Sequence, residues 1–207
     1  MVLFGVALIL GLVAAEGVRE LAGSGTADLR AFDAAAVGRL DTSMWRSYYE
    51  GRRVLLFRQL IATLHEQYHM PPFDAVLNAY RAAHAAFVFK DGRSRADYER
   101  ALPDLTEYYE DVNRRSARKF DAARAAKLEL EWWILHRERP PELAQALAAV
   151  QSEIYHLPVE AFAEHARLRA EAMALRDEKG ERITEEDWAR IGGMLERSWV
   201  ALRQAVN

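Results

Sequence analysis

Residues 41–72 read DTSMWRSYYEGRRVLLFRQLIATLHEQYHMPP, and their pattern is that of a long helix with a defined start and end. The first three residues offer side-chain oxygens that can accept hydrogen bonds from the free N–H groups of a helix N-terminus. The residues of one helix face then recur at helical spacing: Leu56, Leu60, Thr63, Leu64 and Gln67. Pro71 and Pro72 end the pattern, because proline lacks an N–H and clashes with the preceding turn. The stretch predicts one helix from Asp41 to about Met70.

The rest of the sequence repeats these helix signals and shows no sustained alternation of the kind that predicts β-strands. We expect further helices within residues 74–89, 104–139, 141–178 with a break at Pro158, and 184–207. The last has the clearest start, because Thr184 precedes an aspartate by three positions, as in a capping box. The predicted fold class is all-α, an antiparallel helical bundle of about five helices with an N-terminal apolar helix.

The composition is that of a single globular domain, with 207 residues of which 51% are hydrophobic and 29% charged. The formal net charge is −3 and no basic stripe is present, so we expect no nucleic acid as a partner, because nucleic-acid binding needs clustered positive charge. The sequence has no cysteine, which excludes disulfides, thiolate nucleophiles and iron–sulfur clusters. It also lacks a phosphate-binding glycine loop, a dinucleotide fingerprint and a nucleophile elbow.

The N-terminal segment is apolar, and Val2–Ala15 contains no charged residue. Counted on to Ala22, the segment reaches the roughly 20 residues that a membrane-spanning helix needs. We expect residues 1–22 to form a membrane anchor in contact with the lipid bilayer. Residues 23–40 then form a hinge or linker, and residues 41–207 form the helical bundle domain.

Two other interpretations of this segment stay open. A secretory signal peptide cleaved after Ala15 would leave a periplasmic body, although no Lys or Arg precedes the apolar run. A buried core helix is the second, although such a helix usually has one polar face. Arg19 and Arg30 follow the segment and nothing basic precedes it, so the positive-inside rule favours a single-pass membrane protein with a cytoplasmic body.

The run from His65 to His69, HEQYH, resembles the zinc-binding helix of metalloproteases. On a helix the two imidazoles would lie one turn apart and could share a zinc ion, with Glu66 placed to activate a bound water. Against this, Pro71 ends the helix directly afterwards and no third ligand is marked. The simpler interpretation is a polar helix end, where histidines interact with the last carbonyl groups.

Two Glu-x-x-His motifs occur in the sequence: Glu66/His69 and Glu153/His156. Such a pair resembles the di-iron site of ferritin-like bundles, which implies single glutamates from two further helices. Glu129 or Glu131 can supply one of them. The helix order departs from that family, because the segment before the first motif is the apolar N-terminus. We expect no cofactor, with zinc or a di-iron centre as the alternative.

Two pairs of adjacent aromatic residues are candidates for partner binding: Trp132 and Trp133, and Tyr108 and Tyr109. Neighbouring residues on a helix point about 100° apart, so both rings of a pair cannot enter the same core face. We expect one ring of each pair to meet another surface, such as a partner protein or the membrane interface. A wide multi-helix core that covers both rings is the open alternative.

These observations favour a membrane-anchored accessory or interaction subunit of a larger membrane protein complex, with a bioenergetic complex as one candidate host. We expect other subunits of that complex as partners and no enzymatic activity. The alternative is a metalloprotein, a zinc hydrolase or a ferritin-like di-iron protein, with these ligands: His65, Glu66, His69, Glu131, Glu153 and His156. A periplasmic helical binding protein is the third interpretation.

Overall fold

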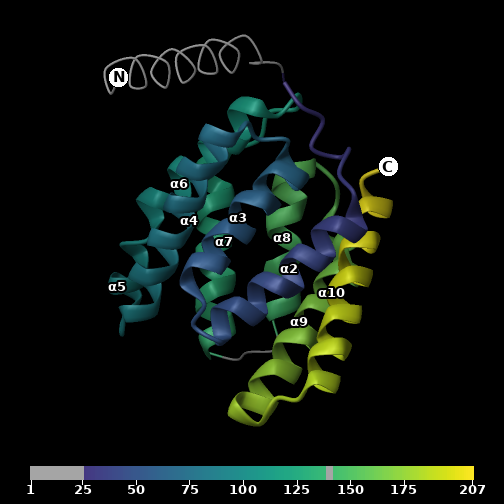
Figure 1. The fold of residues 1–207 in the computed structure, drawn as a ribbon. Helices are drawn as coiled ribbons and strands as arrows, with labels where there is room; N and C mark the ends of the chain where they lie inside the picture. Colours follow the sequence, from purple (N-terminus) through teal and green to yellow (C-terminus); the bar gives the residue numbers. More distant parts are fainter. Residues whose placement is uncertain (1–25, 139–141) are drawn as a thin grey trace, which may run out of the picture.

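The computed structural model describes residues 26–138 and 142–207, which are mostly helical and contain no β-strand (Figure 1). The prediction of an all-α helical bundle is confirmed. The helices are α2 (Ala34–Tyr49), α3 (Arg53–Tyr68), α4 (Pro72–Asp91), α5 (Arg95–Glu99), α6 (Leu102–Arg115), α7 (Ala122–Glu138), α8 (Leu143–Tyr155), α9 (Ala163–Lys179) and α10 (Glu185–Ala205), with short 3-10 turns η1 (Val159–Phe162) and η2 (Gly180–Arg182).

Gly51 divides the single helix that we expected from Asp41 to Met70. α2 ends at Tyr49 and α3 begins at Arg53. Between them Gly51 has a φ of 70°, in the left-handed region that glycine enters without a steric penalty. The expectation of one continuous helix is therefore wrong, because its spacing signal came mainly from the part that is now α3.

The start of α2 lies before the start that the sequence predicted. The Asp33 carboxylate caps the helix and accepts hydrogen bonds from the amides of Ala35 and Ala36, at 2.9 and 3.0 Å. Residues 34–40 are therefore helical, although the sequence assigned them to the hinge or linker.

The expected helix 104–139 is also divided, here by the loop between α6 and α7. The Asn113 side chain closes this loop, since it donates to the Phe120 carbonyl at 2.9 Å and accepts from the Phe120 amide at 3.0 Å. Because of such breaks the described bundle has more helices than the five or so that we expected. The stop at Pro71 and the capping box at Thr184 are confirmed.

The longer helices close into a ring, in which each packs against the next and the last returns to the first. The packed pairs are α2–α3, α3–α4, α4–α6, α6–α7, α7–α8, α8–α9, α9–α10 and α10–α2. The seam between α2 and α10 (Figure 1) is tight at Gly38, where a Cβ atom would lie 2.8 Å from the Glu196 Cα. Across the same seam the Trp199 indole donates a 2.8 Å hydrogen bond to the Asp41 carboxylate.

Bulky side chains fill the inside of this ring. Besides Leu, Ile, Val and Met they include several buried or partly buried aromatic residues: Tyr68, Tyr108, Tyr109, Trp132, Trp133, Tyr155, Phe162 and Trp199. Polar groups lie among these side chains. The charges of Glu129 on α7 and Arg169 on α9 are close enough to Tyr68 on α3 to affect the pKa of its hydroxyl. The interior thus combines apolar packing with a set of hydrogen-bonded polar groups.

The chain enters the described fold beside the α6–α7 loop. The Ala27 amide donates to the Arg115 carbonyl at 2.7 Å, and the Ala117 amide donates to the Ala27 carbonyl at 2.9 Å. None of the described helices is long and apolar enough to cross a bilayer. The expected membrane anchor, residues 1–22, lies outside the described residues.

Candidate functional site

The two histidines of the Glu-x-x-His motifs lie at helix ends. His69 is the C-cap of α3 and His156 is the C-cap of α8, with φ values of 52° and 54°. The His69 Nε2 lies 2.9 Å from the Ala31 carbonyl oxygen, and the His156 Nε2 lies 2.7 Å from the Lys119 carbonyl oxygen. In both cases this ring nitrogen meets the backbone of a distant segment.

Two similar hexapeptides explain why both motifs end a helix in the same way. Residues 66–71 read EQYHMP and residues 153–158 read EIYHLP. In each copy the tyrosine is buried, the histidine leaves the helix in a left-handed conformation, and the proline prevents the helix from continuing. The structure therefore uses both motifs to end a helix and to hold its last turn in the core.

The geometry assumed for the zinc hypothesis is not present. Because His69 lies beyond the end of α3, it does not share a helical face with His65. The His65 Nδ1 instead lies 2.9 Å from the Met70 carbonyl oxygen, and Glu66 is exposed. We expected the helix to continue to about Met70, and α3 ends at Tyr68 instead.

The acidic residues of the metal hypotheses have other partners. Glu153 lies 3.0 Å from the Arg124 guanidinium, and Glu131 lies 2.6 Å from the guanidinium of Arg95. Within residues 26–138 and 142–207 no group of three or more His, Cys, Asp or Glu side chains is placed to hold a metal ion. The zinc and di-iron sites stay predictions of the sequence.

The four aromatic candidates for partner binding lie inside the ring. Tyr109 is buried, and Tyr108, Trp132 and Trp133 are partly buried and pack against the core. Packed helices on either side of α6 and α7 account for this burial and favour the wide core. Partner binding by these four side chains stays a prediction of the sequence.

A partly buried carboxylate lies among these aromatic rings. Glu129 accepts a hydrogen bond from the Trp133 indole at 2.9 Å and another from the Tyr109 hydroxyl at 3.0 Å. Burial raises the pKa of the Glu129 carboxyl, and these donors oppose the shift. The cluster joins α6 to α7. The signal available in the sequence was the four-residue spacing of Glu129 and Trp133, which places both on one helix face.

A second buried polar group joins α9 to α10. The His165 Nδ1 lies 2.8 Å from the Ser198 hydroxyl, and the exposed fractions of the two residues are 2% and 0%. Burial lowers the pKa of His165 to about 3, and the Arg169 charge adds to the shift, so the imidazole is neutral near pH 7. Because neither side chain reaches solvent, this serine–histidine pair serves the fold rather than a reaction.

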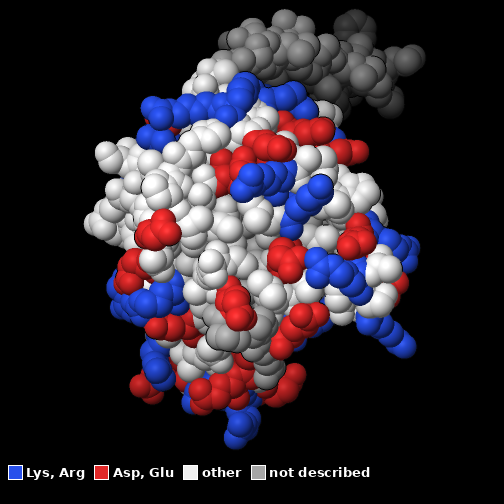
Figure 2. Space-filling view, turned by 180° about the vertical axis from the view of Figure 1, so that it is seen from behind, with Lys and Arg blue, Asp and Glu red and all other residues white. Residues whose placement is uncertain are grey.

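The two ends of the molecule carry opposite charge. Residues 113–124 around the α6–α7 loop contain five basic side chains and one acidic side chain, and we call them the basic end. Residues 176–187 around the α9–α10 turn contain six acidic and three basic side chains, and we call them the acidic end. In Figure 2 Lys and Arg side chains gather along the upper edge, and Asp and Glu side chains are frequent at the lower end.

One side of α4 exposes a stripe of bulky apolar residues. We call this stripe the α4 face: Phe73, Val76, Leu77, Tyr80 and Phe87. Half of the large hydrophobic side chains exposed in the described part of the chain belong to it. The buried side of α4 carries small residues instead: Ala75, Asn78, Ala79 and Ala85. Small residues let the helix pack closely on its neighbours, and the bulky side chains from Phe73 to Phe87 point outward, whereas Val88 and Phe89 pack against the core.

The charge around the α4 face is mostly positive. Residues 51–91, which include α3 and α4, contain five basic and three acidic side chains. One of the three acids, Asp74, pairs with Arg115 at the basic end. The Arg53 guanidinium lies over the ring of Phe87, 5.8 Å from its centroid, and so extends the face toward α3. The result is an apolar stripe with cations beside it and few carboxylates.

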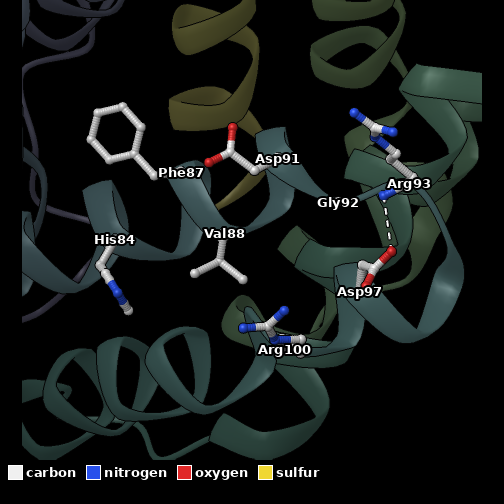
Figure 3. Close-up of a pocket in the computed structure, with 8 residues that line it drawn as sticks. All are labelled: His84, Phe87, Val88, Asp91, Gly92, Arg93, Asp97 and Arg100. Atoms are coloured by element: carbon white, nitrogen blue, oxygen red, sulfur yellow. Dashed lines mark hydrogen bonds between the residues drawn. The ribbon is translucent and has the colours of Figure 1, made fainter.

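The α4 face ends beside an open pocket between the end of α4 and α5 (Figure 3). Its volume is about 480 Å³, and His84, Val88 and Arg100 point toward a common space within it. His84 pairs with Asp104 at 2.7 Å, and Asp97 forms the capping box of α5. Mixed charge and existing partners give this pocket no marked preference for one class of ligand.

Comparison with known proteins identifies no relative, because no protein-family model, no curated protein and no solved structure matches the chain. The inference of function rests on the residues of this chain alone. The sequence pointed to adjacent aromatic pairs and missed the α4 face. Its signal was the segregation of small and bulky apolar residues to opposite sides of one helix, over residues 73–87.

Proposed function

We propose that this protein is a membrane-attached accessory subunit and that a partner protein docks on the α4 face. The observation that carries the proposal is the exposure of Phe73 and Tyr80, at 67% and 59%, within a continuous apolar stripe. Contiguous exposed apolar surface marks interaction sites on folded domains, since water contact with such a surface is unfavourable. Aromatic side chains are also enriched at the centres of protein interfaces.

The charge beside the α4 face defines the chemistry of the partner. Arg53 and Arg58 are exposed on α3, and neither forms an ion pair with the described residues. A partner with an apolar surface and a rim of carboxylates would place its acidic groups near these guanidinium groups. Such complementarity raises the rate of association and favours one orientation over others.

A second copy of this chain fits the α4 face poorly. In a symmetric dimer the same surface would be present on both sides of the interface. Both surfaces would then carry the same excess of positive charge around the stripe, and like charges in an interface cost free energy. The proposal therefore commits to a different protein as the partner.

The position of the α4 face favours a partner in the same membrane. The ion pair between Asp74 and Arg115 joins the start of α4 to the basic end, where Ala27 pairs with the backbone. The apolar run Val2–Ala15 precedes this point in the sequence. In the proposal this run attaches the protein to the bilayer, so the α4 face begins close to the membrane surface.

The test uses the tagged full-length chain, extracted from its native membranes in mild detergent and sized by chromatography with light scattering. The variant Phe73→Ser/Tyr80→Ser removes the two most exposed aromatic rings of the α4 face. A matched control, Tyr48→Ser/Val200→Ser, makes the same change at exposed positions on α2 and α10, where the exposed fractions are 47% and 41%. A photo-reactive residue at Leu77 reports what touches the face.

We expect the wild type and the control to elute in a defined assembly of fixed stoichiometry that the α4 variant loses. We also expect the residue at Leu77 to cross-link to the protein that co-elutes. A wild-type chain that elutes alone or as a homodimer would contradict the proposal. So would an assembly that persists unchanged in the α4 variant.

A further inference from the structure

We propose that the basic end binds anionic lipid headgroups at the membrane surface. This inference rests on the membrane attachment in the proposed function and adds a second contact, made by the folded body itself. Residues 113–124 contain five basic side chains and one acidic side chain, on a loop at one end of the ring. A cluster of Lys and Arg close to a membrane-attached segment is the chemistry that recognises acidic phospholipids.

Three of these cations are accessible. Arg118 is exposed, and its guanidinium forms no ion pair within the described residues. Arg114 is 67% exposed at its side chain, although it also contacts Asp111. The Lys119 Nζ donates to the carbonyls of Asn113 and Arg114 at 2.8 Å, which places an ammonium group at the C-terminus of α6. The other two cations, Arg115 and Arg124, already pair with carboxylates.

The connection of the chain brings this surface to the bilayer. The apolar run ends at Ala15, and Ala27 is held against the α6–α7 loop by two backbone hydrogen bonds. Ala27 is twelve positions after Ala15, so the loop lies within about 40 Å of the end of the run, even with a fully extended chain. A contact between tethered groups benefits from a high effective concentration, so a few weak charge interactions suffice.

The acidic end lies far from the basic end, which favours the same orientation on an anionic surface. Residues 176–187, with six acidic side chains against three basic, lie at the α9–α10 turn, away from the basic end (Figures 1 and 2). An anionic surface attracts the basic end and repels the acidic end, so both favour the same orientation of the body. Charge interactions are screened within about 8 Å at physiological ionic strength. The attraction therefore stabilises only the orientation in which the basic end touches the headgroups.

The test measures binding of the full-length chain to vesicles of phosphatidylcholine alone and of phosphatidylcholine with phosphatidylserine. The variant Arg114→Gln/Arg118→Gln/Lys119→Gln neutralises the basic end. The control Lys179→Gln/Arg182→Gln/Arg190→Gln removes three positive charges near the acidic end. A single variant, Arg118→Glu, serves if the triple variant fails to fold, because the Arg118 side chain has no ion-pair partner among the described residues.

We expect the wild type to bind phosphatidylserine vesicles on the order of tenfold more tightly than neutral vesicles, with the difference falling as salt is raised. The basic-end variant should lose this difference while it still binds neutral vesicles, and the control should keep it. Equal binding of the wild type to both vesicles would overturn this inference and leave the proposed attachment intact. Binding to neither vesicle would overturn both. A preference that survives in the basic-end variants would also overturn the inference.

Discussion

α7 and α4 both carry bulky aromatic side chains, which pack against the core on α7 and are exposed to solvent on one side of α4. On α7, the adjacent Trp132 and Trp133 are both partly buried and pack against the core, because helices pack on either side. On α4, Phe73 and Tyr80 lie on one side, and that side faces solvent. The buried side of α4 carries only small residues, whereas both indoles of α7 pack against the core beside its buried Leu130 and Ile134. An aromatic residue is therefore a sign of an interface only when the opposite side of its helix already supplies the packing.

The largest expected effect is the difference in unfolding free energy between a substitution on α7 and one on the α4 face. Trp133→Ala removes an indole that packs on the core and donates to Glu129, so we expect the free energy of unfolding to fall by about 3 kcal/mol. Phe73→Ala should change it by less than about 0.5 kcal/mol, because its side chain is mostly exposed. Urea unfolding of the detergent-solubilised full-length chain, followed by circular dichroism, measures both. Similar losses for the two variants would contradict the contrast.

A second experiment tests the interior by its pH dependence. The pKa of His165 falls from 6.5 to about 3 on folding, so between these values the unfolded chain binds a proton that the folded chain does not. Stability is therefore complete above pH 6.5 and is lost as the pH falls toward 3. Between pH 7 and 5 we expect the wild type to lose about 2 kcal/mol more than His165→Gln, by urea unfolding at each pH. Parallel losses would show that this histidine is protonated in the folded state.

The smallest expected effect on stability comes from two glycines of the α2–α10 pair, one at the packed seam and one facing open space. Gly38→Ala places a Cβ atom 2.8 Å from the Glu196 Cα, so we expect a loss of about 1–2 kcal/mol in unfolding free energy. Gly193→Ala on α10 meets nothing within 4 Å, and we expect a gain of about 0.5 kcal/mol from helix propensity. Thermal unfolding of the two variants beside the wild type measures both signs. A stabilised Gly38 variant would mean that the seam is loose.

The sequence predicted the elements where local chemistry decides them. Thr184 with its capping partner begins α10, and Pro71 ends the preceding helix, because capping and the missing proline N–H act over a few residues. Gly51 was missed, because a glycine within a helical pattern can either continue a helix or turn it. The Asn113 loop was missed for a similar reason, since its hydrogen bonds to Phe120 need a chain reversal that the spacing does not encode.

The candidate site was less predictable than the fold. Whether Trp132 meets a core or a partner depends on the helices on either side of α7, and those contacts are set by ring closure. The Glu-x-x-His motifs matched a metal pattern in letters, yet His69 and His156 adopt backbone angles that end the helix. The α4 face was readable from the segregation of small and bulky residues on one helix. That pattern identifies an exposed face only when the side of the helix that packs on the core is known.

Closure of the ring also constrains the order in which the molecule can fold. Asp41 and Trp199 are 158 positions apart and meet at the α2–α10 seam, whereas most other packed helix pairs are neighbours in the sequence. Neighbouring helices can form hairpins early, because the entropy lost in closing a short loop is small. Contacts between distant positions slow folding, so the seam should close last and open first. Unfolding from the native state would then begin as an open arc of helices, with α2 and α10 as its two free edges.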